Sequence, residues 1–254
     1  LYYQFVARDI LQNTQRNYTR LAKIISEARL AGLIDWSMLI DRTRNLKELL
    51  HFTDGRDALQ KLARWYHINM WDNQEYRPEV WIEKDALIGV IEGICQKWDV
   101  PYFSCRGYTS QSEMWHASQR MLRHARDGYT PVVLHFGDHD PSGKDMSRDI
   151  TDRLEMFMRG QGIEFMRKAL NMVQVKKYNP PPNPAKVTDS RAKVYIKEFG
   201  NKSWELDALE PSVLTQLIED SLAEIRDDKV WNADVVAVEK VRKKLINTAK
   251  RWRA

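Results

Sequence analysis

Three acidic residues follow the ends of two predicted strands. Glu83 comes directly after the apolar run 80–82, and Asp138 and Asp140 come after the apolar run 131–136. If both runs are parallel strands of one sheet, all three carboxylates open at the same edge of that sheet. Hard oxygen ligands of this kind suit Mg²⁺, which keeps several of its waters and holds phosphates. The sequence therefore predicts a magnesium site formed by Glu83, Asp138 and Asp140.

The residues around the two aspartates favour a binding turn over an ordinary one. An Asp-x-Asp motif in an extended turn directs both carboxylates to one ion, while His139 between them points elsewhere. Gly137 and Gly143 allow a tight backbone, and a helix is expected to begin near Ser142, where free N–H groups could receive a phosphate. A solvated or capping turn is the alternative for such a motif. A zinc site with His135 and His139 fits less well, because no cysteine is near and no His-x-x-x-His pair occurs.

Several charged residues near these motifs are weaker candidates. Lys84 and Lys144 could contact phosphate, although a lysine at the start of a helix is often merely solvated. Arg106 follows the second predicted strand at the same edge and could position a phosphate; an ordinary turn is the alternative. Glu205 and Asp207 could add carboxylates to the metal site, but capping or a salt bridge is the favoured interpretation.

The middle of the chain alternates between strand-like and helix-like segments. Predicted strands at 80–82, 100–105 and 131–136 alternate with predicted helices at 86–98, 110–126 and from 142 toward 158. This order predicts an α/β fold with a parallel sheet and right-handed crossovers. After Gly162 the pattern loosens, and 173–175 is a candidate for another strand.

The N-terminal segment resembles a DNA-binding domain in outline. One helix is expected within 1–12 and a second after the N-cap at Thr14. A short extended stretch then begins at 33–36 and ends at the basic tip that contains Arg42 and Arg44. Short helices followed by a basic, strand-like tip are typical of a winged helix-turn-helix, and we expect Arg42 and Arg44 to contact DNA.

These patterns divide the chain into four segments. We predict a winged-helix domain, a linking helix with its turn, a parallel-sheet domain and a C-terminal extension, at 1–50, 51–77, 78–180 and 181–254. The helix of the linker is expected over about 56–71, and an amphipathic helix is expected over 233–254.

The composition of the 254 residues is that of a globular protein. Apolar residues make up 43% and charged residues 30%, and no run of eighteen apolar residues could form a membrane span. A net charge of +5 permits a polyanionic partner without requiring one. Two cysteines, Cys95 and Cys105, are too few for a disulfide framework, so a cytoplasmic location is expected. The expected DNA contacts add an association with the nucleoid.

Two motifs carry a family resemblance. The segments 82–86 (Ile-Glu-Lys-Asp-Ala) and 137–143 (Gly-Asp-His-Asp-Pro-Ser-Gly) resemble the two signature blocks of Toprim domains. The form with Asp-Pro-x-Gly is most similar to the A subunit of topoisomerase VI and its meiotic double-strand-break relatives. Segment 1–3 resembles the end of that family's Arg-x-x-Tyr-Tyr block, and segment 204–209 resembles a late block with Glu and Ala-Leu. The resemblance covers most of the chain, which looks like a small stand-alone relative.

The resemblance implies both a fold and an activity. The fold would be a winged helix-turn-helix domain followed by a Rossmann-like Toprim domain. Glu83, Asp138 and Asp140 would bind Mg²⁺, and Tyr3 would attack DNA to form a phosphotyrosyl link; Arg106 and Lys144 would join Arg42 and Arg44 in contacting DNA. In the family the tyrosine of one subunit works with the Toprim site of the other. A homodimer is therefore expected, with a separate ATPase subunit as a further partner.

Two other functions remain open on the sequence. A Toprim nuclease could hydrolyse DNA with a metal-bound water, in which case Tyr2 or Tyr3 would be a core aromatic residue of the first helix. A non-catalytic DNA-binding protein could use the winged helix alone, with the carboxylates as a relic. The intact set of three carboxylates weakens this last interpretation.

Overall fold

The computed structural model describes residues 2–8, 10–38, 49–186 and 188–252. The chain divides into two compact units. The first comprises Tyr3–Ile10 and Asn69–Trp231, and the second comprises Tyr2, Leu11–Ile68 and Asn232–Ala254. None of the described helices is long and apolar enough to cross a membrane.

The first unit is built around a parallel sheet. Over the described residues the sheet has four strands in the order β2-β1-β3-β4, and every neighbouring pair is parallel. The strands are β1 (Tyr76–Ile82), β2 (Tyr102–Ser104), β3 (Thr130–Phe136) and β4 (Glu164–Ala169). The predicted α/β fold with a parallel sheet is confirmed.

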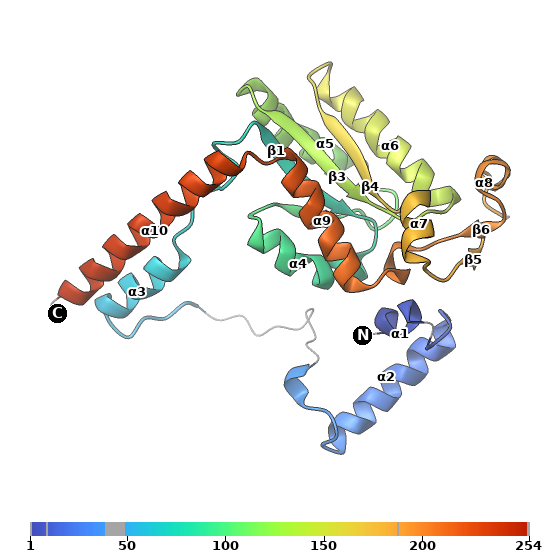
Figure 1. Cartoon of the computed structure of the whole chain (residues 1–254), viewed down its shortest axis with the longest axis horizontal. Helices are drawn as coiled ribbons and strands as arrows, with labels where there is room; N and C mark the ends of the chain where they lie inside the picture. The colour runs from blue at the N-terminus through green and yellow to red at the C-terminus, as the bar shows by residue number, and fades with distance from the viewer. Residues whose placement is uncertain (1, 9, 39–48, 187, 253–254) are drawn as a thin grey trace. The chain divides into compact units, whose positions relative to one another are not determined.

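Helices cover both faces of this sheet, which is why its central strands β1 and β3 are buried over nearly their whole length. On one face lie α4 (Ile88–Lys97) and α9 (Pro211–Ile225); on the other lie α5 (Gln111–Arg126) and α6 (Pro141–Met158) (Figure 1). Successive strand residues point to opposite faces. Val80 and Ile82 therefore belong to the core under α4 and α9, whereas Trp81 belongs to the core under α5 and α6.

Shorter elements complete the first unit. These are η2 (Asp85–Leu87), α7 (Met172–Tyr178), α8 (Ala192–Phe199), η3 (Leu206–Ala208), and an antiparallel pair formed by β5 (Asn183–Pro184) and β6 (Lys202–Ser203). The predicted strand at 173–175 is wrong, because those residues lie in α7. Asn171 caps that helix and forms a reciprocal capping box with Gln174, which fixes helical backbone despite two valines nearby. The fourth strand is β4, which the loosening pattern after Gly162 did not reveal.

The second unit is helical. It contains α2 (Gln15–Leu30), a 3₁₀ turn η1 (Trp36–Met38), α3 (Gly55–Trp65) and most of α10 (Asp228–Arg251). The Thr14 hydroxyl accepts a hydrogen bond from the Asn17 N–H at 3.2 Å, which confirms the predicted N-cap. The extended stretch expected from residue 33 is instead a bend followed by η1, and the linking helix ends at Trp65 rather than near residue 71. Arg42 and Arg44 lie outside the described residues.

Candidate functional site

The register of the sheet aligns three strand ends. Ile82 pairs with Ser104 on one side and with Phe136 on the other, so β1, β2 and β3 end at the same level. The Glu83 N–H donates to the Phe136 carbonyl at 2.9 Å, which continues the ladder by one residue. Glu83 and the turn after β3 therefore leave the sheet together at its carboxyl edge, where parallel sheets present ligand sites.

Glu83 and Asp138 are in direct contact at this edge. Glu83 Oε2 accepts a hydrogen bond from the Asp138 N–H at 2.7 Å, although 55 positions separate the two residues in the chain. Asp138 Oδ1 in turn accepts from the Leu206 N–H at 2.7 Å. The two side chains are 8% and 5% exposed. The structure thus brings together carboxylates that lie far apart in sequence.

Asp140 completes the turn and begins α6. Its Oδ1 accepts hydrogen bonds from the Gly143 N–H at 2.6 Å and from the Ser142 hydroxyl at 3.0 Å. Asp140 is therefore the N-cap of α6, as the capping alternative proposed. At 9% exposure it is also buried beside Glu83, whose pKa its charge helps to raise.

Two glycines make room for the Glu83 carboxylate. A Cβ at Gly137 would lie 2.9 Å from Glu83 Oε2, and a Cβ at Gly143 would lie 3.1 Å from the same atom. At Gly143 the added atom would also collide with the Asp138 carbonyl oxygen. Both positions require glycine because the backbone passes so close to the carboxylate.

Arg167 holds the backbone of the turn and was not among the predicted site residues. Its guanidinium donates to the carbonyl oxygens of Asp138 at 2.5 Å and of Gly143 at 3.1 Å, and to the Ser147 hydroxyl. Burial lowers the pKa of Arg167, while the charges of Glu83 and the two aspartates act in the opposite direction. The residue comes from β4, so recognising that strand was the one signal that could have identified it.

Lys84 joins the turn to a later segment of the chain. Its Nζ lies 2.8 Å from Glu205 Oε2, 3.0 Å from Asp207 Oδ1 and 3.5 Å from Asp138 Oδ2. Burial alone would lower the pKa of Lys84, but the neighbouring carboxylates raise it well above its ordinary value. The favoured interpretation of Glu205 and Asp207 as salt-bridge partners is confirmed.

Negative charge exceeds positive charge in this cluster. The described residues place five carboxylates, Glu83, Asp138, Asp140, Glu205 and Asp207, near the half-buried cations Lys84 and Arg167, and Lys186 acts on Glu205 as well. Burial, and then the charge of Glu83, raise the pKa of Asp138 to about 8. Burial also raises the pKa of Glu83. Burial of this kind disfavours the ionised form of a carboxyl group, and a nearby cation or a proton offsets that cost.

His139 in the turn and His135 in β3 are both buried. The His139 Nδ1 is 2.8 Å from the Tyr195 hydroxyl, and its ring packs against Phe199 and Trp204. Burial lowers the pKa of His139 to about 4, and burial with the charge of Arg167 lowers that of His135 to about 3. In the described part of the chain, no three or more His, Cys, Asp or Glu side chains stand ready to hold a metal ion jointly.

The remaining candidates are separate from this cluster. Arg106 forms an exposed ion pair with Asp85 at 3.0 Å. Lys144 lies in the first turn of α6, and its ammonium is 5.5 Å from the centre of the Phe199 ring. Tyr3 lies in α1 (Tyr2–Ala7), and its side chain is outside the described part of the structure.

Tyr2, its neighbour, is a packing residue of the second unit. It is 8% exposed and contacts the Tyr18 ring edge-on at a centroid distance of 5.3 Å. Its hydroxyl accepts a hydrogen bond from the Thr14 N–H at 2.9 Å. This is the core role that the sequence allowed for either tyrosine.

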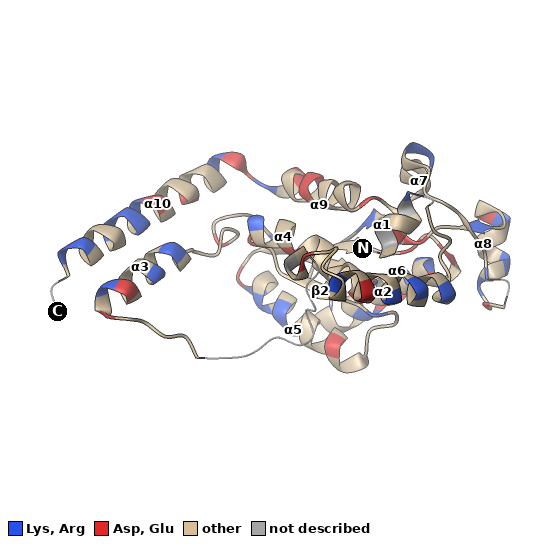
Figure 2. Cartoon of the chain, turned by 90° about the horizontal axis from the view of Figure 1, so that it is seen from below, with Lys and Arg blue, Asp and Glu red and all other residues tan. Residues whose placement is uncertain are grey.

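Positive charge on the second unit gathers along α10 (Figure 2). The basic residues of that helix include Lys240, Lys243, Lys244, Lys250 and Arg251. Such a helix can serve as a solvated face or as a surface for phosphates.

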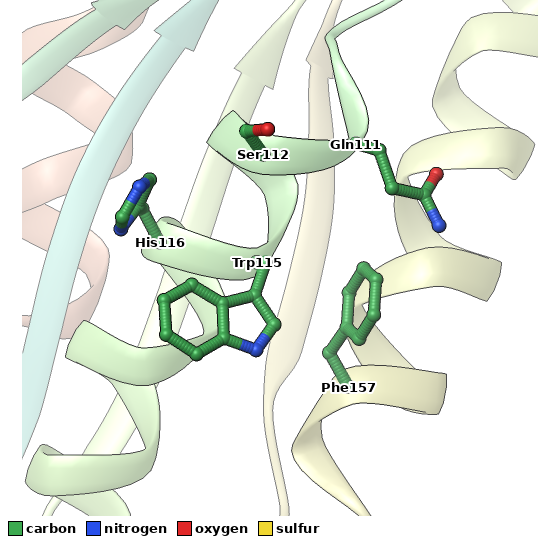
Figure 3. Close-up of a pocket in the computed structure, with 5 residues that line it drawn as sticks. All are labelled: Gln111, Ser112, Trp115, His116 and Phe157. Atoms are coloured by element: carbon green, nitrogen blue, oxygen red, sulfur yellow. The ribbon is translucent and has the colours of Figure 1, made fainter.

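A separate cavity lies between α5 and α6 of the first unit, and its lining differs from that of the carboxylate site. It has a volume of about 280 Å³, and Trp115 of α5 and Phe157 of α6 flank it (Figure 3). His116 also lines it, with its ring 5.1 Å from that of Trp115. None of the residues that line this cavity is a carboxylate, so it is not a part of the acidic site.

Comparison of the chain with protein-family models, with curated proteins and with solved structures found no significant match.

Proposed function

We propose that this protein is a Mg²⁺-dependent DNA-cleaving enzyme and that Glu83, Asp138 and Asp140 hold the cation. One observation carries the proposal: three buried carboxylates from two distant segments meet at the carboxyl edge of a parallel sheet, with excess negative charge. Buried carboxylates without enough counter-charge are costly unless a cation or a proton joins them.

The residues at this edge fit a hard divalent cation. Hydrogen bonds among the described residues engage one oxygen each of Glu83 and Asp140, and Gly137 and Gly143 leave space around the Glu83 carboxylate. Asp138 accepts a hydrogen bond on Oδ1 and pairs with Lys84 through Oδ2, so a cation there would share that oxygen with the ammonium. Because the side chains are not already arranged around a common point, binding would require at least one carboxylate to turn toward the ion. When bound, Mg²⁺ would neutralise charge on a phosphate and stabilise the departing oxygen.

The other residues of the site would position the substrate. Arg167 fixes the backbone that carries Asp138 through its bond to the carbonyl oxygen, and so keeps the turn rigid. Lys144 at the start of α6 and Arg106 after β2 would pair with phosphates of the DNA backbone. In the second unit, Arg42 and Arg44 would do the same if residues 1–50 form a winged helix in front of a Toprim domain.

The resemblance to the topoisomerase VI A subunit supplies a nucleophile. The Tyr3 oxygen would attack the scissile phosphorus, form a phosphotyrosyl bond and release a DNA hydroxyl, after losing its proton to a base. The tyrosine would come from the partner subunit of a homodimer, and a separate ATPase subunit would drive strand passage. Both partners are part of this proposal, as is association with the nucleoid.

Hydrolysis is the second candidate, because the described carboxylate site would suffice for it without Tyr3. The two mechanisms are distinguished by incubating supercoiled plasmid with the protein and Mg²⁺. The reaction is then stopped with denaturant, with and without protease, and the DNA ends are examined for bound protein. We expect nicked or linear DNA whose ends carry protein, with no product in EDTA or with Asp138→Ala. An Asp152→Ala variant is a control, since Asp152 is exposed on α6.

The outcome with Tyr3→Phe decides between the mechanisms. Loss of protein-linked ends in this variant supports transesterification, whereas persistence of free ends supports hydrolysis. Cleavage by Asp138→Ala at the wild-type rate would refute the proposed role of the carboxylates in either mechanism.

A further inference from the structure

A second cavity opens beside the carboxylate site. It has a volume of about 580 Å³, within the range of roughly 300–1,000 Å³ that small-ligand sites occupy. Most of its residues come from β2 and from the loop that leads into α5, so it lies at the carboxyl edge of the sheet; Asp85, Ile88 and Glu113 complete its lining. The Cys105 N–H in its wall donates to the Ile82 carbonyl at 2.8 Å, and the next residue after Ile82 is Glu83. The cavity is therefore adjacent to the acidic cluster.

The wall of this cavity combines aromatic rings with polar groups. Tyr102, Phe103 and Tyr108 contribute rings, and Asp85 and Glu113 contribute carboxylates. Flat ligands gain from ring contacts, and hydrogen-bonding groups then fix their orientation. This combination suits a nucleobase with amino and carbonyl groups on its edge.

Two hydroxyls in the wall lack a strong hydrogen-bond partner. Ser104 Oγ and Thr109 Oγ1 are buried and make no hydrogen bond to the described residues, apart from the weak Cys105 thiol beside Thr109. Buried hydroxyls are normally paired, so an unpaired one indicates a missing partner. Both oxygens are shielded from solvent in this conformation, so pairing with a ligand in the cavity requires the side chain to rotate about its Cα–Cβ bond.

The loop at the mouth of the cavity is strained. Arg106 is a non-glycine residue with φ of 47°, a left-handed conformation, and Gly107 follows with φ of 82°. Residues held in sparsely populated conformations often present a side chain for binding. The exposed Arg106–Asp85 pair has side chains 72% and 53% exposed, so the guanidinium can exchange this partner for a phosphate at little cost.

We propose that this cavity binds one nucleotide of the DNA strand next to the scissile phosphate. The base lies against the aromatic wall and pairs with Ser104 and Thr109, and its phosphate pairs with Arg106. The cavity thus gives the enzyme a base preference at one position beside the cut. This inference rests on the proposed DNA cleavage, but its binding step does not require the metal.

The test uses the double variant Ser104→Ala/Thr109→Val, which removes both hydroxyls while keeping side-chain shape. The matched control is Ser212→Ala/Thr215→Val on α9, where the Thr215 hydroxyl is exposed and already bonded to the Ser212 carbonyl. Binding of the four deoxynucleoside 5′-monophosphates and of an eight-nucleotide single strand is measured by calorimetry in EDTA. Sequencing of plasmid ends after cleavage in Mg²⁺ reports the base preference.

We expect the double variant to bind the preferred nucleotide and the strand about five- to tenfold more weakly, as the loss of one or two hydrogen bonds would produce. Its unfolding temperature should rise, because the unpaired hydroxyls are gone; a merely structural role predicts a fall. The base preference at one position beside the cut should disappear. The control should match the wild type in all three measurements.

Other results would overturn the proposal in distinguishable ways. Unchanged binding in the double variant, together with cleavage that has no base preference, refutes the cavity and leaves DNA cleavage intact. Tight mononucleotide binding that the single strand does not compete with would assign the cavity to a free nucleotide instead. Hydroxyl-dependent strand binding without any DNA cleavage would refute the proposed function and leave a strand-binding site.

Discussion

Asp138→Asn tests whether the buried negative charge of Asp138 destabilises the fold when no metal ion is bound. The amide keeps an oxygen to accept the Leu206 N–H and removes only the charge. Lys84 loses little, because its contacts with Glu205 at 2.8 Å and Asp207 at 3.0 Å are shorter than its 3.5 Å contact with Asp138. In EDTA at alkaline pH the variant should therefore be more stable than the wild type.

The magnitude follows from the pKa of Asp138, which rises from 3.8 to about 8 on folding. A folded-state pKa above the unfolded value means that stability is full below pH 4 and is lost as pH rises toward 8. At about 1.4 kcal/mol per pH unit, the loss over this window is about 6 kcal/mol. Water penetration and side-chain relaxation reduce such penalties, so we expect about 2–4 kcal/mol between pH 5 and pH 8.5.

Urea denaturation at these two pH values measures the effect. The free energy of unfolding of Asp138→Asn, minus that of the wild type, should increase by about 2–4 kcal/mol from pH 5 to pH 8.5. Asp152→Asn, which removes an exposed charge from α6, should show a difference within about 0.5 kcal/mol at both.

Mg²⁺ should narrow the difference in stability between the variant and the wild type. At a concentration ten times its Kd, Mg²⁺ would stabilise the wild type by about 1.4 kcal/mol, which for a chain of this size is a rise of several degrees in Tm. The stability of Asp138→Asn should not change when Mg²⁺ is added. A variant that is less stable than the wild type at pH 8.5 in EDTA, or that responds equally to Mg²⁺, would refute the reasoning.

Three further substitutions test the surroundings of the carboxylates. Gly143→Ala should lower the free energy of unfolding by about 1–3 kcal/mol in urea titrations, because its Cβ collides with the Asp138 carbonyl. Lys84→Met should lower the free energy of unfolding by about 3–5 kcal/mol at pH 8, because it leaves Glu205 and Asp207 without their ammonium partner. The loss should be smaller at pH 5, where protonation of these carboxylates removes their charge; equal losses at the two pH values would contradict this. Arg167→Lys should keep the charge but lose the forked bonds to the turn, so calorimetry should find Mg²⁺ affinity lowered about tenfold or more.

The central strands could be predicted because burial on both faces leaves a clear pattern. β3 and the last three residues of β1 (80–82) are largely apolar, and the acidic residues that follow them are therefore visible in sequence. The first half of β1 contains the charged residues Arg77 and Glu79 and was not predicted as strand. β4 lies at the edge of the sheet and is mostly half-buried, so Glu164, Arg167 and Lys168 interrupt its pattern. Missing that strand also meant missing Arg167, whose role depends on a position and not on a motif.

The partners of Lys84 illustrate what local patterns leave undetermined. His139 and Trp204 form an isolated antiparallel bridge, with N–H to carbonyl distances of 2.8 and 2.9 Å in the two directions. This bridge fixes the segment around Trp204 against the Asp-x-Asp turn. Glu205 and Asp207 therefore reach Lys84, although Glu205 is 121 positions away in the chain and Asp207 is slightly farther.

The ammonium of Lys84 satisfies one side of the acidic cluster. On the other side, Glu83, Asp138 and Asp140 face Arg167, whose hydrogen bonds go to backbone carbonyls and the Ser147 hydroxyl. Burial keeps the pKa of Asp138 and of Glu83 raised, although the charge of Lys84 lowers both and that of Arg167 lowers the pKa of Glu83. Further positive charge is therefore needed most where Glu83 contacts Asp138, and we expect a cation that binds this protein to bind there.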